Sequence, residues 1–198
     1  MNILIDLVPD TVEIDGIDYK INTCFRISMM FELLMQDNSI PEDEKLKMAL
    51  NLYYEEVPDN LNKAVEKILW FYKCGKEDDI SNSNNTENAN NNSKKADNIY
   101  SFGHDDEYIY SAFLDQYGID LQDIEHLHWW KFKAMFKSLK DDNLISKIMG
   151  YRSITISSDM SDNDKKYYRK MKEIYALPDN RTQEEKENDF DNVLSSIF

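Results

Sequence analysis

The sequence predicts a mainly helical protein with a small N-terminal β-hairpin, an α+β arrangement in which helices dominate. Three observations support this fold class. Apolar residues recur at helical spacing in most segments, an Asp-Gly pair interrupts a short alternating segment near the N-terminus, and the 198 residues include only 5 glycines and 4 prolines. So few turn-forming residues argue against a loop-rich all-β protein. Because 41% of the residues are hydrophobic, the chain has enough apolar material to bury a core.

The hairpin is predicted over residues 11–21, TVEIDGIDYKI. Asp15-Gly16 lies between alternating apolar positions, which is typical of a type I′ turn with positive φ at both central residues. An isolated two-stranded hairpin is marginally stable in water, so we expect it to pack on helices. The register expected from this turn pairs Val12 with Tyr19 and Ile14 with Ile17.

Small polar residues precede the apolar-periodic segments that follow the hairpin. Such residues cap helices because a side-chain oxygen accepts one of the free backbone N–H groups of the first turn. The predicted helices are 24–35 capped by Thr23, a helix from the Ser39-x-x-Glu42 capping box to about Tyr54, and a helix capped by Asp59 or Asn60 that ends at Gly75.

The second half of the chain carries the same signals. Apolar faces at helical spacing alternate with acidic or hydroxyl-bearing cap residues. The predicted elements are a helix over 105–118 stopped by Gly118, an element starting at Asp120-x-x-Asp123, a helix over 128–140, a short helix capped by Asp142 and ending near Gly150, a short strand over 151–157, and a helix capped by Ser161-x-x-Asp164 and ended by Pro178.

An asparagine-rich segment, residues 76–98, interrupts these elements. Seven of the eleven residues in 82–92 are asparagine, and so few apolar side chains cannot offset the entropy of ordering. We expect a long disordered loop that acts as a flexible linker. It divides a hairpin and three-helix part, 1–75, from a helical part, 99–177, which precedes an acidic C-terminal tail, 178–198.

The net charge of −15 limits the choice of partners. It disfavours general binding to nucleic acids and to anionic membrane surfaces. No apolar run approaches the roughly 20 residues that span a bilayer, and the N-terminus does not predict a signal peptide. Two cysteines, Cys24 and Cys74, cannot make a disulfide framework. These features predict a soluble, cytosolic protein with reduced thiols.

The charge is unevenly distributed. Residues 99–125 contain seven acidic residues and no basic one, whereas 126–177 contain 11 basic against 6 acidic residues. The tail, 178–198, contains 6 acidic and 2 basic residues. The simplest interpretation is that the acidic and basic stretches of the second half pack together. The alternative is a basic docking surface for an acidic partner.

A nucleic-acid-dependent or metal-dependent enzyme is the alternative that the histidines raise. The candidate ligands are His104, Asp105, Asp106, His126 and His128. His126 and His128 would lie about 160° apart on a helix, so they cannot chelate one ion from it. Acidic residues just before a helix are typical of caps, so we interpret Asp105 and Asp106 as structural and His128 as partly buried and hydrogen-bonded. With no phosphate-binding or nucleophile motif present, we predict a non-catalytic protein without a cofactor.

Two sets of side chains are candidates for binding a partner. Methionines suit adaptable apolar surfaces as well as irregular cores, and an aromatic ring beside lysines resembles a nucleic-acid stacking surface. For the first set the alternative is burial in the core, and for the second it is a solvated face. The candidates are Phe25, Met29, Met30 and Leu33 in the first set and Trp130, Lys133 and Lys137 in the second.

Two motifs carry a family resemblance. They are YGIDL, with Tyr117, Gly118 and Asp120, and HWWKF, with His128, Trp129, Trp130 and Phe132. With the hairpin, the helical segments around these motifs resemble the bacteriophage gp-fifteen family, small tail-module proteins of phages and prophages of Gram-positive bacteria. The resemblance covers nearly the whole of 1–178.

The resemblance implies a role in assembling long phage tails. Such proteins are similar, by gene position, to tail assembly chaperones, which coat the long apolar tape measure protein before tail tube subunits polymerise around it. It implies the tape measure protein and the tail tube protein as partners and the host bacterial cytoplasm as the location, with no nucleic acid or membrane involved. A structural tail component is the alternative, and self-association stays open.

Overall fold

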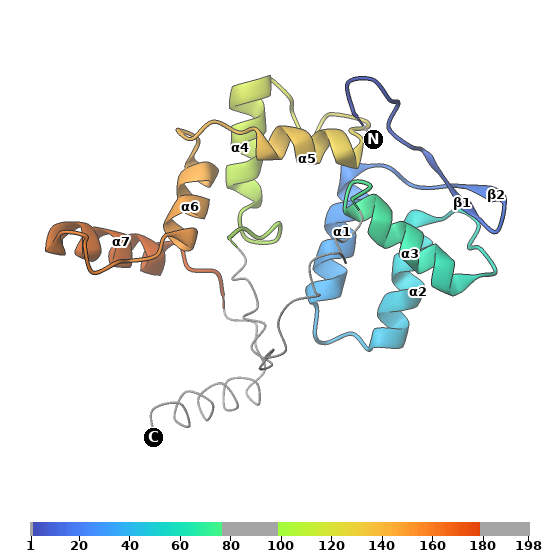
Figure 1. Cartoon of the computed structure of the whole chain (residues 1–198), viewed down its shortest axis with the longest axis horizontal. Helices are drawn as coiled ribbons and strands as arrows, with labels where there is room; N and C mark the ends of the chain where they lie inside the picture. The colour runs from blue at the N-terminus through green and yellow to red at the C-terminus, as the bar shows by residue number, and fades with distance from the viewer. Residues whose placement is uncertain (1, 77–98, 179–198) are drawn as a thin grey trace, which may run out of the picture. The chain divides into compact units, whose positions relative to one another are not determined.

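The computed structural model describes residues 2–76 and 99–178. Within these residues it has seven α-helices and one two-stranded antiparallel sheet, so the mainly helical fold with an N-terminal hairpin is confirmed (Figure 1). The predicted Asn-rich loop, apart from Lys76, and the tail from residue 179 lie outside the described residues. The chain divides into two compact units, Met1–Lys147 and Ile148–Phe198.

The hairpin consists of β1 (Thr11–Ile14) and β2 (Ile17–Lys20). Asp15 and Gly16 have φ values of 53° and 80°, as a type I′ turn requires. The Asp15 carboxylate accepts hydrogen bonds from Asn60 at 2.8 Å and from the Lys63 ammonium, which ties the turn to the start of the third helix. The register is confirmed: Val12 pairs with Tyr19 and Ile14 with Ile17.

Three helices follow the hairpin: α1 (Phe25–Gln36), α2 (Glu42–Tyr53) and α3 (Leu61–Tyr72). The Asn60 cap is confirmed, since its side chain accepts the backbone N–H of Lys63 at 3.3 Å. The end of α3 differs slightly from the expectation. The Gly75 N–H does reach back to the Trp70 carbonyl, but Cys74 is the first left-handed residue, with φ 58°.

Two predicted caps are wrong. Thr23 does not cap α1, because its hydroxyl hydrogen-bonds with Nε2 of His126 at 3.0 Å. The capping box at Ser39 is not formed either, because the Ser39 hydroxyl donates to the Asp37 carboxylate at 2.6 Å and Pro41 occupies the N-cap of α2. In both places the hydroxyl hydrogen-bonds with another side chain, and no side-chain hydrogen bond caps the helix.

Residues 99–178 form four helices: α4 (Asp106–Tyr117), α5 (Trp129–Lys137), α6 (Leu144–Ser153) and α7 (Asp162–Ile174). Gly118 ends α4 in the left-handed conformation with φ 64°, as predicted. Ser161 caps α7 by accepting the Asp164 N–H at 3.2 Å, also as predicted.

Two other predicted elements are absent from this part of the described chain. Asp120 does not begin a helix. Its carboxylate accepts the N–H groups of Gln122 and Asp123 and closes a turn instead. The strand predicted over 151–157 does not form, because α6 continues to Ser153 and residues 154–157 have no regular structure.

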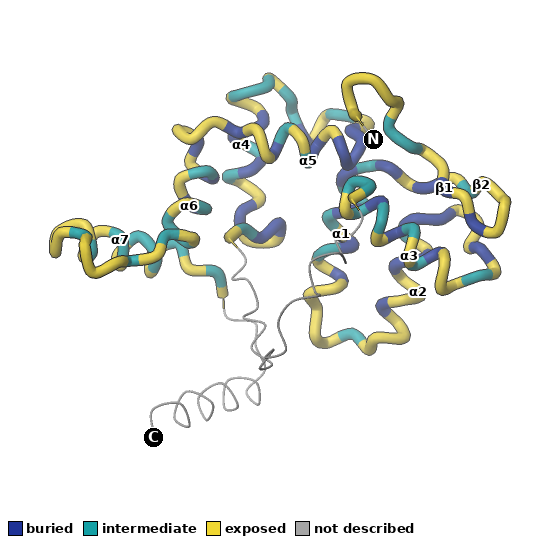
Figure 2. Tube along the Cα trace, viewed as in Figure 1, coloured by how far each residue is buried: buried dark blue, intermediate teal, exposed yellow. Residues whose placement is uncertain are grey.

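The core of unit 1 is aromatic and draws on helices from both sides of residues 77–98 (Figure 2). Phe25 of α1 stacks on Phe132 of α5 at 5.2 Å, and Phe113 of α4 stacks on the same ring at 4.8 Å. Tyr72 of α3 stacks on Trp129, whose indole N–H donates to the Tyr72 carbonyl at 2.9 Å. Of these contacts, the stack of Phe113 on Phe132 joins the acidic 99–125 stretch to the basic stretch after it, and it does so through aromatic rings.

Across residues 2–76 and 99–178, no helix combines the length and the apolarity that crossing a membrane would demand.

Candidate partner-binding surface

The outward face of α1 carries part of the apolar set expected to bind a partner. The exposed fractions of Met30 and Leu33 are 51% and 40%, and Met29 is half-buried. Phe25 is only 3% exposed because its ring stacks on Phe132. Phe25 therefore belongs to the core, and the accessible apolar stripe of α1 consists of Met29, Met30 and Leu33.

The inward face of α1 is fixed by close packing, which holds the outward stripe in place. The Phe31 ring lies edge-on against the rings of Tyr53 and Tyr72 at 5.5 and 5.3 Å. The Tyr53 hydroxyl donates to Ser28 at 2.9 Å in a buried position. Burial raises the pKa of Tyr53, so this hydroxyl stays protonated at any physiological pH. The buried residues of α1 are Phe25, Ser28, Phe31 and Leu34.

Arg26 fixes the first turn of α1 to a distant loop. Its guanidinium donates to the carbonyl oxygens of Leu121 at 2.7 Å and Ile124 at 3.0 Å. The same group lies 4.8 Å from the centre of the Phe25 ring. One nitrogen of the guanidinium, Nη2, thus donates to carbonyl groups of a single loop and holds that loop against α1.

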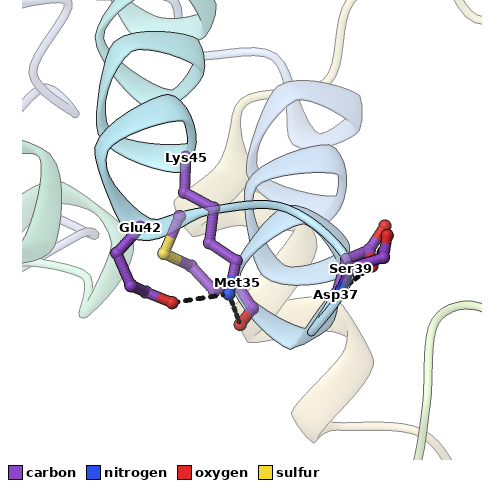
Figure 3. Close-up of polar contacts among 5 residues, drawn as sticks. All are labelled: Met35, Asp37, Ser39, Glu42 and Lys45. Atoms are coloured by element: carbon purple, nitrogen blue, oxygen red, sulfur yellow. Dashed lines mark hydrogen bonds and ion pairs between the residues drawn. The ribbon is translucent and has the colours of Figure 1, made fainter.

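A buried lysine fixes the last turn of α1. Lys45 is 4% exposed, and its ammonium donates to the Met35 carbonyl at 3.4 Å and to the Glu42 carboxylate at 2.8 Å (Figure 3). A cation is favourable there because the last carbonyl groups of a helix carry partial negative charge. In the connecting loop, Asp37 accepts the hydroxyl and the N–H of Ser39, which lowers the pKa of the Asp37 carboxyl (Figure 3).

The turn before α4 borders the stripe. A methyl group placed on Gly103 would lie 3.3 Å from Cδ2 of Leu33, so this turn lies against α1. Asp105, 1% exposed, holds the turn by accepting the Ser101 N–H at 2.9 Å. The acidic residue expected to cap α4 through its side chain thus stabilises the turn that precedes the helix.

The second candidate set does not form an exposed aromatic surface. Trp130 is 5% exposed, and its indole N–H donates to the Phe71 carbonyl at 2.7 Å. The Lys133 ammonium lies 5.2 Å from the centre of the Trp129 ring, and Lys137 is exposed. A nucleic-acid base has no access to the Trp130 ring in this arrangement. The lysines therefore have no exposed tryptophan beside them on which a base could stack, contrary to the candidate surface drawn from the sequence.

His128 and its neighbours in the HWWKF motif organise the start of α5. Nδ1 of His128 accepts the Trp130 N–H at 3.1 Å, which leaves the hydrogen on Nε2 to donate to the Pro9 carbonyl at 3.0 Å. Burial lowers the pKa of His128 and favours this neutral form. His128 therefore caps α5 and is buried, while Trp129 and Phe132 fill the core.

The YGIDL motif closes the turn after α4. The Tyr117 hydroxyl donates to the Met135 carbonyl at 2.8 Å and joins α4 to α5. Gly118 supplies the left-handed residue, and Asp120 accepts the Tyr110 hydroxyl at 3.0 Å besides its backbone donors. Both motifs thus have structural roles within unit 1.

The candidate metal ligands are not gathered into one site. Within the described residues, no group of three or more His, Cys, Asp or Glu side chains is placed to hold an ion. The side chains of His126, His128 and Asp105 are hydrogen-bonded to Thr23, to backbone groups of Pro9 and Trp130, and to Ser101. His104 and Asp106 are exposed.

Both cysteines are free thiols. Burial raises the pKa of Cys74, which disfavours its thiolate, the reactive form of a cysteine nucleophile.

Arg26 and Lys45 are the positioning residues that the sequence did not indicate. The partners of Arg26 lie 95 to 98 residues away, so no local pattern reveals them. Lys45 lies three residues after Glu42 on a helix that starts with three acidic residues, a spacing that ordinarily indicates an exposed ion pair. Only the low exposure of Lys45 distinguishes it.

Comparison with known proteins gives one match. A search of curated proteins finds no match to this chain, and neither does a search of solved structures. A protein-family model, described as Bacteriophage Gp15 protein, matches residues 4–177, a range that includes all nine helices and strands of the described residues. The chain therefore belongs to the bacteriophage Gp15 protein family and is a structural or assembly protein of a phage.

Proposed function

We propose that this chain is a non-catalytic tail assembly chaperone that binds the tape measure protein in the host bacterial cytoplasm and keeps it soluble until tail tube subunits replace it. The observation that carries this proposal is the stripe of Met29, Met30 and Leu33 on a helix fixed at both ends. An acidic protein with a rigid apolar stripe suits a partner with apolar helical faces.

The charge of the chain supports the same role. A long tape measure helix exposes apolar stripes that would aggregate in water. Many bound copies with a net charge of −15 each would repel one another and keep the complex in solution. Since tube subunits must displace these copies, each contact has to be weak, and the total affinity comes from repetition along the partner.

Co-expression of the full chain with segments of the neighbouring tape measure protein tests the proposal. We expect the tape measure segment to co-purify with the chain and to precipitate without it. The double variant Met30→Glu/Leu33→Glu should retain about tenfold less of the segment, because two apolar contacts are replaced by solvated carboxylates. Leu61→Glu/Leu69→Glu is the matched control, since Leu61 and Leu69 are 46% and 41% exposed on α3.

Several outcomes would count against the proposal. Equal retention of the tape measure segment by the double variant and by the control would show that the α1 stripe does not contact the segment. Retention of no tail protein by the unmodified chain would remove the chaperone role altogether. Presence of the chain in finished virions would favour a structural tail component, because a chaperone is released before the tail is complete.

A further inference from the structure

Unit 2 contains an open basic groove along α7. The groove has a volume of about 850 Å³ and lies between one face of α7 and the segment 156–158. We call it the α7 groove. Its charged lining residues are Lys165, Lys166, Arg169 and Lys170, together with Asp162 and Glu173.

The positive charge of the α7 groove is only partly used within the described residues. Lys165 donates to the Ser158 carbonyl at 2.8 Å and so fixes one wall of the groove to the other. Lys166, Arg169 and Lys170 are exposed, and none of them forms an ion pair with any residue in 2–76 or 99–178. Three adjacent cations are thus available to an acidic ligand in a protein that is otherwise strongly acidic.

The opposite face of α7 packs within unit 2. Its tyrosines pack against the end of α6 within unit 2, where the Tyr151 ring contacts Tyr168 and stacks on Tyr175 at 5.9 Å. The Arg152 guanidinium donates to the Tyr175 carbonyl at 2.6 Å. These contacts leave the basic face of α7 pointing away from the packed side.

An acidic segment of matching length follows α7 in the sequence. Between Glu184 and Asp191 there are five acidic residues and one lysine. The groove-lining residues of α7 extend over about 17 Å of helix at 1.5 Å per residue. Six extended residues after Pro178 span about 20 Å, enough for Glu184 to reach the near end of the groove at Lys170 and Glu173. From there the residues 184–191, when extended, span about 23 Å and run along the whole groove. Length and charge therefore both match.

We propose that the acidic segment Glu184–Asp191 binds in the α7 groove of the same molecule. A tether of so few residues gives an effective concentration in the millimolar range, so weak surface ion pairs are sufficient to hold the segment. The bound segment neutralises the positive charge that Lys166, Arg169 and Lys170 give the α7 groove. An acidic segment of a partner can use the α7 groove only by displacing it.

Chymotryptic cleavage after Phe190 in the full-length chain tests this proposal. Phe190 lies between Asp189 and Asp191, so binding of the segment should protect this bond. The triple variant K166E/R169E/K170E should be cleaved there about fivefold faster, because exposed ion pairs are individually weak. High salt should accelerate cleavage of the unmodified chain in the same way. The control K131E/K137E/K140E changes the net charge equally at exposed lysines of unit 1 and should be cleaved at the original rate.

A charge exchange separates specific binding from a general charge effect. The tail variant E184K/E185K/E187K should also be cleaved faster, and its combination with K166E/R169E/K170E should restore slow cleavage. Circular dichroism of each variant checks that α7 remains helical. Equal cleavage rates for the unmodified chain and the groove variant, or failure of the combined variant to recover, would overturn the proposal. Protection that increases with protein concentration would assign the segment to the groove of a second copy instead.

Discussion

Replacing Gly75 with alanine should destabilise the protein more than any other glycine-to-alanine change at a positive φ. Gly75 follows α3 with φ 71°, and its N–H donates to the Trp70 carbonyl at 2.9 Å. An added Cβ would lie 2.8 Å from Cη2 of Trp130. That ring cannot withdraw easily, because Trp130 is 5% exposed and its indole N–H is bonded to the Phe71 carbonyl.

The expected magnitude has two parts. A non-glycine residue in the left-handed conformation costs about 1–2 kcal/mol. Forcing a methyl group into a packed aromatic contact costs about 1–3 kcal/mol more. Gly75→Ala should therefore lower the free energy of unfolding by about 3 kcal/mol. Gly118→Ala is a matched control, because Gly118 has φ 64° and no atom within 4 Å of its Cβ position, so only the first cost applies.

Urea unfolding followed by circular dichroism and by tryptophan fluorescence measures both variants. We expect the Gly75 variant to lose about 2 kcal/mol more than the Gly118 variant. A change in tryptophan emission should accompany the loss, since Trp130 must move. If the two variants have the same free energy of unfolding, the close contact between Gly75 and Trp130 does not constrain the fold, and the reasoning fails.

Two further predictions concern buried polar side chains. Because the pKa of His128 lies below its ordinary value of 6.5, the unfolded chain binds this proton first, and stability should fall as the pH drops below about 6.5 until His128 also protonates in the folded state. Urea titrations between neutral and mildly acidic pH should show a flatter pH dependence in His128→Asn, whose side chain can still accept the Trp130 N–H. Lys45→Met should lower the free energy of unfolding by about 1–2 kcal/mol, because the Met35 carbonyl loses its donor. Lys47→Met is the control, since Lys47 is exposed, and its midpoint of thermal unfolding should change little. Equal changes of the midpoint in the two variants would contradict a role for the buried ammonium.

The parts of the fold that the sequence predicted correctly depend on neighbouring residues. The hairpin register follows from the Asp15-Gly16 turn and the alternation around it, because turn type and pairing are decided within a few residues. The caps at Asn60 and Ser161 follow for the same reason, as each accepts an N–H three residues ahead. Local chemistry was sufficient at these positions because no distant group competes there.

The incorrect expectations arise where a competing partner takes the decisive group. Thr23 has the right spacing for a cap, yet its hydroxyl pairs with His126, 103 residues away. The Ser39 hydroxyl donates instead to the carboxylate of Asp37, only two residues before it. The sequence pattern places Trp130 beside lysines on a candidate binding surface, yet Trp130 is buried because α3 supplies Trp70 and the Phe71 carbonyl.

The difference between buried motif residues and exposed residues also determines where a partner can bind. The motifs that carry the family resemblance place His128, Trp129 and Phe132 in the interior, so they specify the shared fold and leave little area for contact. Partner contacts must then come from exposed residues that no motif marks. The α1 stripe and the α7 groove meet this condition, one apolar and one basic, and they lie in different units of the chain. Because apolar binding persists at high salt whereas ionic binding weakens, the salt dependence of retention separates their contributions to any complex.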